Sequence, residues 1–380
     1  MNFDLNDDQK LLVGTVADFC KKESTVERMR KLRETELGYA KETWAKMGEL
    51  GWLSVLFPEE MGGLGGSFTD AALIIEQLGT TLVPEPYIAS VVLAGLAIRY
   101  SVSDEDGAEI LAPLIDGSEV FALAYTEAQS RHDVTNVTTR AEKSGDGFKL
   151  TGKKRWVLAG HGADKLVVSA RTSGETRDRD GVSLFLVDAN AAGVKRTRVD
   201  MMDGHKAAMI DFEGADARLL GEAGKAAAVL EQVMDYGAAA ACAEGAGIMQ
   251  TVLGMTRNYL CEREQFGMKI GTFQALQHRT VDMFVETQLA KSSAIMAMIK
   301  ADDADPAERA RAISAAKCQL ALSGGFVVRQ GTQLHGGIGV TDEHDIGLYF
   351  KRMHSLLTLF GDEEFHTQRF ASSEAFTAHV

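Results

Sequence analysis

CEREQFGMKIGTFQALQHR, residues Cys261–Arg279, separates two long helical patterns in the sequence. Gly267 and Gly271 interrupt the helical periodicity, and a new pattern begins at Thr272. Glycine adopts backbone conformations that other residues avoid, so these two positions predict turns. We therefore expect this stretch to connect two helices.

Arg263 is the candidate ligand-binding residue of this connection. Its guanidinium is always charged, and its planar set of donors matches the oxygens of a phosphate. The neighbours that could contact a dinucleotide together with it are Gln265, Phe266, Gly267 and Gln274. The same spacing also suits an ordinary helix-turn-helix corner in which Arg263 pairs with Glu262 or Glu264.

A second interruption, QLHGGIG at 333–339, falls inside a later helical pattern. Its glycines allow backbone N–H groups to approach a ligand closely. Together the two segments resemble the C-terminal half of the acyl-CoA dehydrogenase family. The resemblance implies that they hold the ADP half of an FAD bound mainly by a neighbouring subunit. The positions implied are Arg263, Gln265, Phe266, Gln274, Gln333, Leu334, Gly336 and Gly337.

Composition narrows the class of protein. The chain has 380 residues, 45% of them hydrophobic, which suits two or three globular domains. A net charge of −14 argues against a nucleic-acid or anionic-membrane partner. The four cysteines are widely spaced, which argues against zinc and disulfides and fits a reducing cytoplasm. The acidic N-terminus does not resemble a signal peptide, and no metal-ligand spacing is present.

The hydrophobic periodicity changes twice along the chain. Residues 1–117 predict an N-terminal helical domain, 118–219 a middle β-domain, and 220–380 a C-terminal helical bundle. The resulting fold is α+β and mainly helical, as in the acyl-CoA dehydrogenase family. Six short β-rich runs are expected in the middle domain: 120–125, 147–151, 153–158, 165–171, 182–187 and 209–213.

The middle domain resembles the family's flavin-facing domain, with two departures. The family loop T-E-P-x-x-G-S-D reads TEAQSRHD at 126–133, so Arg131-His132 replaces Gly-Ser. The family strand W-I-T/S-N-G reads WVLAG at 156–160, so Leu158 replaces a hydroxyl residue. The resemblance implies that Thr126, Trp156 and Leu158 lie against the flavin. Both departures affect this half of the cofactor site.

The expected reaction requires a carboxylate base. In the family a carboxylate removes the α-proton of an acyl thioester while hydride leaves the β-carbon for FAD. Counting back from Gln368-Arg369 places Asp362 in the base position, whereas counting forward from the glycine segment places Phe360 there, so the spacing differs from the family's. Asp362 is therefore the candidate base, with Glu363 and Glu364 in reserve. Asp362 could instead cap a helix after Gly361, and the sequence leaves both interpretations open.

Other candidates carry less weight. Glu244 lies about two helical turns from the position that some family members use for the base. His335 and His366 are expected to be structural histidines.

Three functional hypotheses follow from the resemblance. The first is an FAD-dependent acyl-CoA dehydrogenase that passes electrons to an electron-transferring flavoprotein, as a homo-oligomer or a heterotetramer with a related subunit. The second is a non-catalytic, half-site subunit of such a heteromer. The third is a flavoenzyme like the nitroalkane oxidases, in which Asp replaces Glu. A fatty acyl, dicarboxylic or steroid side-chain substrate remains open.

Overall fold

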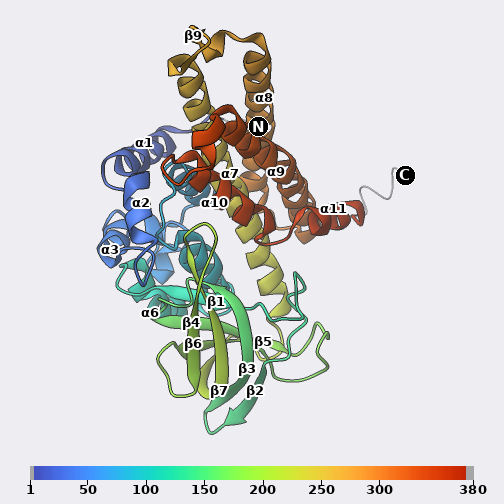
Figure 1. The fold of residues 1–380 in the computed structure, drawn as a ribbon. Coiled ribbons are helices and arrows are strands. Elements are labelled where there is room, and N and C mark those ends of the chain that lie inside the picture. Colours follow the sequence, from blue (N-terminus) through green and yellow to red (C-terminus); the bar gives the residue numbers. More distant parts are fainter. Residues whose placement is uncertain (1–3, 374–380) are drawn as a thin grey trace. The chain divides into compact units, whose positions relative to one another are not determined.

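The computed structural model of the protein, drawn in Figure 1, describes residues 4–373. These residues form two compact units. Unit 1 contains residues 4–30, 68–83 and 238–373, and unit 2 contains residues 31–67 and 84–237. The α+β, mainly helical fold predicted from the sequence is confirmed. Residues 4–117 contribute to both units, and the domain boundaries at 117 and 219 stay a prediction.

Unit 1 is a helical bundle. Its helices are α1 (Asp7–Lys22), α4 (Phe68–Gly79), most of α7 (Ala227–Glu262), α8 (Gln274–Lys300), α9 (Pro306–Leu334), α10 (Ile346–Thr358) and α11 (Glu363–Ala371). Its short elements are β8 (Glu264–Gln265), β9 (Met268–Lys269) and the 3₁₀ turns η4 (Ile270–Thr272) and η5 (Gly336–Val340). Helix α9 packs against α8, α10 and α11, and α1 packs against α4.

Local sequence signals explain where these helices begin. The Asn6 side chain accepts a hydrogen bond from the Gln9 backbone N–H at 2.8 Å and caps α1. Asp305 caps α9 by accepting from the Ala307 N–H at 2.9 Å, and Pro306 occupies the first helical position. A Cβ at Gly247 would lie 2.0 Å from the Glu76 carbonyl oxygen, so α7 and α4 approach closely only because glycine stands there.

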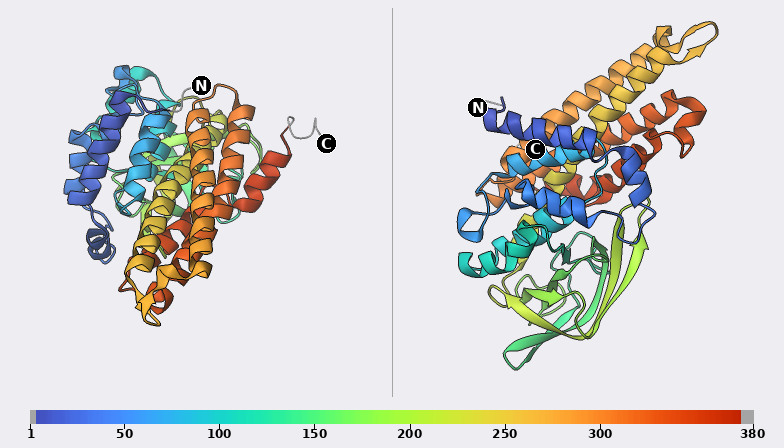
Figure 2. Two further views of the ribbon diagram at one scale, coloured as in Figure 1. Left: turned by 90° about the horizontal axis from the view of Figure 1, so that it is seen from above. Right: turned by 90° about the vertical axis from the view of Figure 1, so that its left-hand side faces the viewer.

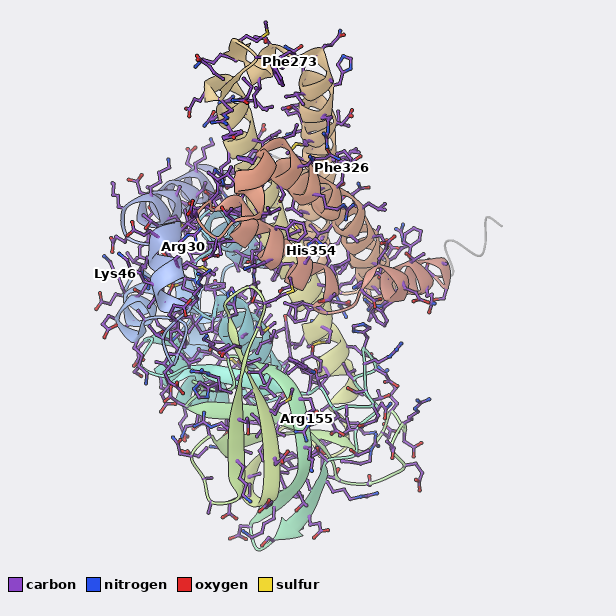
Figure 3. All side chains as sticks on the ribbon, viewed as in Figure 1. Arg30, Lys46, Arg155, Phe273, Phe326 and His354 are labelled. Carbon is purple, nitrogen blue, oxygen red and sulfur yellow. The ribbon has the colours of Figure 1, made fainter. Side chains whose placement is uncertain are left out.

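Helices α7 and α8 run side by side to the β8–β9 hairpin, as both views of Figure 2 show. Phe273 lies at the outer end of this pair, between η4 and α8 (Figure 3). The Cys261–Arg279 stretch is therefore an extended connection between two long antiparallel helices.

Unit 2 combines a sheet with short helices. Its helical elements are α3 (Lys41–Glu49), the 3₁₀ turns η1 (Trp52–Ser54) and η2 (Glu59–Met61), the π-helical segment η3 (Ile88–Gly95), α5 (Leu96–Arg99), α6 (Asp104–Ile115) and the start of α7. Helix α2 (Val26–Leu32) contributes residues to both units, because the division falls after Arg30. The strands are β1 (Phe121–Ala124), β2 (Arg140–Ser144), β3 (Gly147–Leu158), β4 (Lys165–Arg171), β5 (Val182–Asp188), β6 (Val194–Asp200) and β7 (Lys206–Leu220).

The sheet closes on itself. Its order is β1-β4-β2-β3-β7-β5, β4 also pairs with β5, and β6 pairs with β7. Alternating side chains such as Leu150, Val168, Phe185 and Ile210 fill its core. The two predicted runs at 147–151 and 153–158 form the single strand β3, which is bulged between Leu150 and Thr151. The pattern does not predict β2 (RAEKS) or β6 (VKRTRVD), because charged residues break their apolar alternation.

Candidate functional site

The β8–β9 hairpin carries the first group of predicted residues. Gln265 pairs with Met268, and Phe266 and Gly267 form the turn, both with positive φ (+55° and +77°). A positive φ costs a non-glycine residue energy, and the Phe266 side chain is 89% exposed. An exposed aromatic residue held in a strained turn is typical of a binding segment.

Arg263 lies exposed at the base of this hairpin. Its backbone N–H donates to the Tyr259 carbonyl at 2.8 Å, and its carbonyl accepts from the Ile270 N–H at 2.9 Å. Within residues 4–373 no carboxylate pairs with its guanidinium, whereas Glu264 pairs with Lys269 at 2.7 Å. The interpretation in which Arg263 pairs with a neighbouring glutamate is therefore wrong. Gln274, also exposed, begins α8.

The glycine segment lies near the end of α7. The Tyr259 ring stacks on His335 with centroids 4.6 Å apart, which brings the residues before Arg263 next to the residues before Gly336. Gln333 is exposed on the last turn of α9, whereas Leu334 is buried. Gly336 and Gly337 are exposed, and a Cβ at either position would meet no atom within 4 Å. Their backbone is open to a ligand.

His335 is buried and fixed beside this segment. Its Nδ1 lies 2.7 Å from the Gly331 carbonyl oxygen, so Nδ1 is the donor. Its Nε2 is buried without a hydrogen-bond partner among the described residues. Burial lowers the pKa of His335, and nearby His344 lowers it further, so the ring is held neutral. The expectation of a structural histidine accounts for Nδ1 but leaves Nε2 available as an acceptor.

Unit 2 carries the second group of predicted residues. Thr126 and Trp156 are neighbours, because the Arg155 N–H donates to the Thr126 carbonyl at 2.8 Å. Trp156 has φ +55° at a second bulge of β3 and is 56% exposed. Arg155 itself lies on the sheet (Figure 3) and pairs with Asp211 at 2.9 Å. The bulge therefore directs an aromatic side chain outward beside Thr126.

The two departures from the family pattern lie on the same unit. Leu158 ends β3, half-buried, and pairs with Ala207 on β7. Arg131 is exposed and has φ +46°, a left-handed conformation at a position where the family pattern has glycine. The backbone thus adopts a left-handed turn there despite the bulkier side chain.

A buried ion pair supports the Thr126 loop. Lys154 Nζ lies 2.8 Å from Glu127 Oε1 and 2.9 Å from Ser169 Oγ, with both charged side chains fully buried. The Glu127 carboxylate also accepts from the Thr138 and Thr139 backbone N–H groups at 2.8 and 3.0 Å. Sequence reasoning missed Lys154, because a lysine on an alternating strand is usually exposed.

Asp362 occupies the turn between α10 and α11. Its Oδ1 accepts from the Phe365 N–H at 2.9 Å, so it is the N-cap of α11. The capping interpretation is thus confirmed, and the carboxyl group is only half-buried. Glu363 and Glu364 are exposed in the first turn of α11. A cap and a base are compatible roles for one carboxylate, and the catalytic role stays a prediction.

Glu244 has a different role. Its two oxygens accept from Arg352 Nε and Nη2 at 2.5 and 2.7 Å, and both side chains are largely buried. This two-point ion pair joins α7 to α10 within unit 1. A carboxylate engaged in this way is a structural residue.

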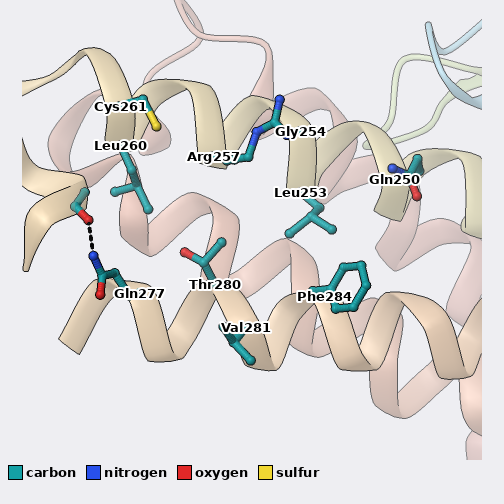
Figure 4. A pocket seen from close by; sticks show the side chains of 11 residues that line it. Gln250, Leu253, Gly254, Arg257, Leu260, Cys261, Gln277, Thr280, Val281 and Phe284 are labelled. Atoms are coloured by element: carbon teal, nitrogen blue, oxygen red, sulfur yellow. Dashed lines mark hydrogen bonds between the residues drawn. The ribbon is translucent and has the colours of Figure 1, made fainter. Parts of the chain in front are cut away.

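A groove of about 530 Å³ lies between α7 and α8 (Figure 4). Leu253, Leu260, Val281 and Phe284 form its apolar walls, and Gln277 donates to the Gly271 carbonyl at 2.9 Å at one end. The groove is continuous with the exposed face of α8.

Among residues 4–373 no three His, Cys, Asp or Glu side chains form a metal-binding group. None of the helices in that range has both the length and the apolar character needed to cross a membrane.

The chain thus combines a helical bundle, with Arg263 exposed beside an open glycine segment, and a closed sheet with an outward tryptophan. Three family models match the chain: the N-terminal domain of acyl-CoA dehydrogenase at residues 6–118, the middle domain at 122–215 and the C-terminal domain at 226–374. The chain belongs to the acyl-CoA dehydrogenase family, as the sequence resemblance predicts. It is an oxidoreductase of this family.

Two relatives illustrate the family's range. Acyl-CoA dehydrogenase IpdE2 of Mycolicibacterium smegmatis is 31% identical over 94% of this chain and 96% of its own. Subunit CarC of the caffeyl-CoA reductase-Etf complex of Acetobacterium woodii is 26% identical over 90% of this chain and 91% of its own.

Solved structures agree with this assignment. A variant of the Tcur3481-Tcur3483 steroid ACAD has a TM-score of 0.87 at 30% identity, covering 98% of this chain and 99% of its own. The ChsE4-ChsE5 complex from Mycobacterium tuberculosis also has a TM-score of 0.87, at 26% identity and 99% coverage of both chains.

The family binds FAD, and the residues present fit the cofactor. In unit 1, the unpaired Arg263 cation suits a pyrophosphate, and the open backbone at Gly336 and Gly337 leaves room for it. In unit 2, exposed Trp156 beside Thr126 suits a flat ring system. Leu158 offers the ring no hydrogen bond.

Proposed function

We propose that the chain catalyses α,β-dehydrogenation of an acyl-CoA thioester to a trans-2-enoyl-CoA. The observation that carries the proposal is Asp362, a half-buried carboxylate on the α10–α11 turn, which counting back from Gln368-Arg369 assigns to the family's base. FAD, when bound, supplies the hydride acceptor for this chemistry.

The chain's own residues have separate tasks in this proposal. Asp362 accepts the α-proton, and its bond to the Phe365 N–H fixes the direction of the carboxyl group. Arg263, Gln265, Phe266 and Gln274, with the Gln333–Gly337 segment, hold the anionic end of a dinucleotide. Thr126 and Trp156 hold the ring system of the FAD bound mainly by their own chain, whereas the unit 1 residues serve the FAD of a neighbouring subunit.

The test is α-proton exchange between solvent deuterium and an acyl-CoA panel of fatty, dicarboxylic and steroid side-chain thioesters. Asp362→Asn keeps a capping oxygen but removes the base, so exchange should fall by about 100-fold or more. Asp305→Asn is the matched control, because it changes a cap of the same kind on α9. Exchange that persists in Asp362→Asn would remove Asp362 from the mechanism.

A half-site subunit is the second candidate function. The observation that favours it is the pair of departures on unit 2, Arg131-His132 and Leu158, which leave the ring-facing residues without two expected contacts. Flavin content of the chain purified alone separates the candidates. About one FAD per chain supports an independent enzyme, and a colourless chain that gains flavin only with a related subunit supports the half-site role.

The electron acceptor, the assembly and the cellular location of the chain are part of the same proposal. We propose an electron-transferring flavoprotein as electron acceptor, a homo-oligomer or heterotetramer as the assembly, and a cytoplasmic location. The relatives named as complexes support the first two proposals. Oxygen consumption with nitroalkanes, in place of thioester oxidation, would instead assign a nitroalkane-oxidase-like reaction.

A further inference from the structure

We propose that Lys317 and His366 are positioning residues that hold the Phe360–Asp362 turn, and with it the carboxylate of Asp362, in one conformation. This inference rests on the proposed function, because it assigns the role of the turn from the base that the turn carries. Both residues lie in unit 1 with the turn itself.

The backbone of this turn is in an energetically unfavourable conformation. Phe360 has φ +60°, a left-handed conformation that a non-glycine residue adopts only at a cost. Gly361 has φ +113°, and a Cβ there would lie 2.5 Å from His366 Nε2 and from Phe365 Cδ1. Strain of this kind persists only where surrounding groups impose it.

Lys317 holds the turn from the α9 side. Its ammonium is buried and donates to the carbonyl oxygens of Leu356 at 2.7 Å and Leu359 at 2.9 Å. Both carbonyls belong to the end of α10, where the last helical turn lacks partners of its own. Lys317 thereby fixes the chain immediately before Phe360.

His366 holds the turn from the α11 side. Its Nε2 lies 3.0 Å from the Phe360 carbonyl oxygen, so Nε2 is the donor. Its Nδ1 lies 3.2 Å from Ser314 Oγ on α9, and in the neutral ring it accepts from that hydroxyl. The peptide between Phe360 and Gly361 is thus held by a ring that α9 anchors in turn.

Charge links Lys317 to the carboxylate as well. The titratable groups that act on Lys317 are Cys242 on α7, Cys318 on α9 and Asp362 before α11. Burial lowers the pKa of Lys317 to about 8, and the attraction of Asp362 opposes that shift. The attraction is mutual, so the Lys317 cation favours the ionised carboxylate that a base must present.

The test compares Lys317→Met and His366→Phe with the unmodified chain. Lys291→Met is the matched control, because Lys291 is a half-exposed lysine on neighbouring α8 that pairs only peripherally, at 3.5 Å, with Glu76. Two readouts are needed: amide hydrogen exchange of residues 359–366, and the pH profile of α-proton exchange with an acyl-CoA.

We expect both variants to raise amide exchange in 359–366 by about tenfold or more while the amides of α8 stay protected. Lys317→Met should also move the acid limb of the pH profile upward, because the cation is gone. His366→Phe should lower the rate without moving that limb. Lys291→Met should change neither readout.

The outcomes separate two failures. If amide exchange of 359–366 is unchanged in Lys317→Met and His366→Phe, the positioning role is wrong. If the turn opens in these variants but Asp362→Asn retains α-proton exchange, the positioning role stands and the proposed base fails. An opened turn with an unmoved acid limb would reject the electrostatic part of the proposal.

Discussion

At the scale of single residues, three buried cations find different hydrogen-bond partners. Lys154 pairs with a buried carboxylate, and Lys317 donates to helix-end carbonyls. Arg171 is buried, and the carbonyl groups that accept from its guanidinium form what we call the carbonyl cage. Arg171 donates to the carbonyls of six loop residues: Thr135, Val137, Ser173, Thr176, Asp178 and Asp180. One side chain therefore organises two loops of unit 2.

Arg171→Met should destabilise unit 2, because it removes the donor that six loop carbonyls share. We expect a loss of about 3 kcal/mol in the free energy of unfolding. Urea denaturation followed by circular dichroism measures it. Arg177→Met, an exposed arginine of the same loop that the cage does not use, should change stability by less than about 0.5 kcal/mol. Equal stability of both variants would show that the cage contributes nothing.

Arg263→Ala should weaken retention of FAD, because it removes the only unpaired cation that we assign to the cofactor's phosphates. A charge-assisted hydrogen bond of this kind is worth about 1.5–3 kcal/mol, so affinity should fall about tenfold or more. Flavin absorbance per chain after gel filtration measures retention. Arg257→Ala, an exposed arginine of α7, is the control. Full occupancy in Arg263→Ala would contradict the assignment.

At the scale of elements, strand β3 fixes the loop between β1 and β2. The Lys154 side chain of β3 holds Glu127, and Glu127 holds the backbone at Thr138 and Thr139. Burial alone would raise the pKa of Glu127, but the Lys154 charge and the hydrogen bonds from the Lys154, Thr138 and Gln129 side chains hold it well below its usual range. The ionised carboxylate therefore stabilises the loop that carries Thr126.

This shift predicts a pH dependence of stability. The native state binds fewer protons than the unfolded state below the ordinary glutamate pKa of about 4.3, so stability from Glu127 is present above that pH and is lost as pH falls. Glu127→Gln should lower stability at pH 7 by about 3 kcal/mol, because Lys154 stays buried without a counterion. It should also flatten the loss between pH 5 and 3, roughly the window of that titration. Unfolding curves across this range measure both effects, and an unchanged slope would contradict the assignment.

At the scale of the whole molecule, one exposed face of α8 carries several large apolar side chains. Val281, Phe284, Val285 and Leu289 lie there, each about half exposed, beside the α7–α8 groove. The sequence places these four residues on one helical face, and a contiguous apolar face that stays exposed is typical of a subunit interface. We therefore assign this face to the proposed oligomer.

Phe284→Glu should dissociate that oligomer, because it would bury a carboxylate among apolar residues. Light scattering after gel filtration should show the mass falling to that of one chain or one dimer. Leu11→Glu, an exposed leucine of α1, is the control and should leave the mass unchanged. A wild-type mass in Phe284→Glu would place the interface elsewhere.

Local patterns in the sequence were sufficient to predict much of the secondary structure. The helix and strand periods identify the mainly helical fold and four of the strands closely, and the caps at Asn6 and Asp305 follow from residue types a few positions apart. The glycine segments identify the family, because glycines that let a backbone approach a ligand stand next to one another or a few positions apart in the sequence. The site roles of Arg263 and Asp362 remain predictions from the same local evidence.

Only the tertiary structure revealed the distant groups that the buried charged residues contact. Lys154 meets a carboxylate 27 positions away, and Lys317 meets a carbonyl 39 positions away. It also showed that Glu244 is occupied by Arg352 and that Arg263 has no glutamate partner within residues 4–373. Sequence patterns record the period of one element, whereas burial of a charge depends on which distant groups the fold brings around it.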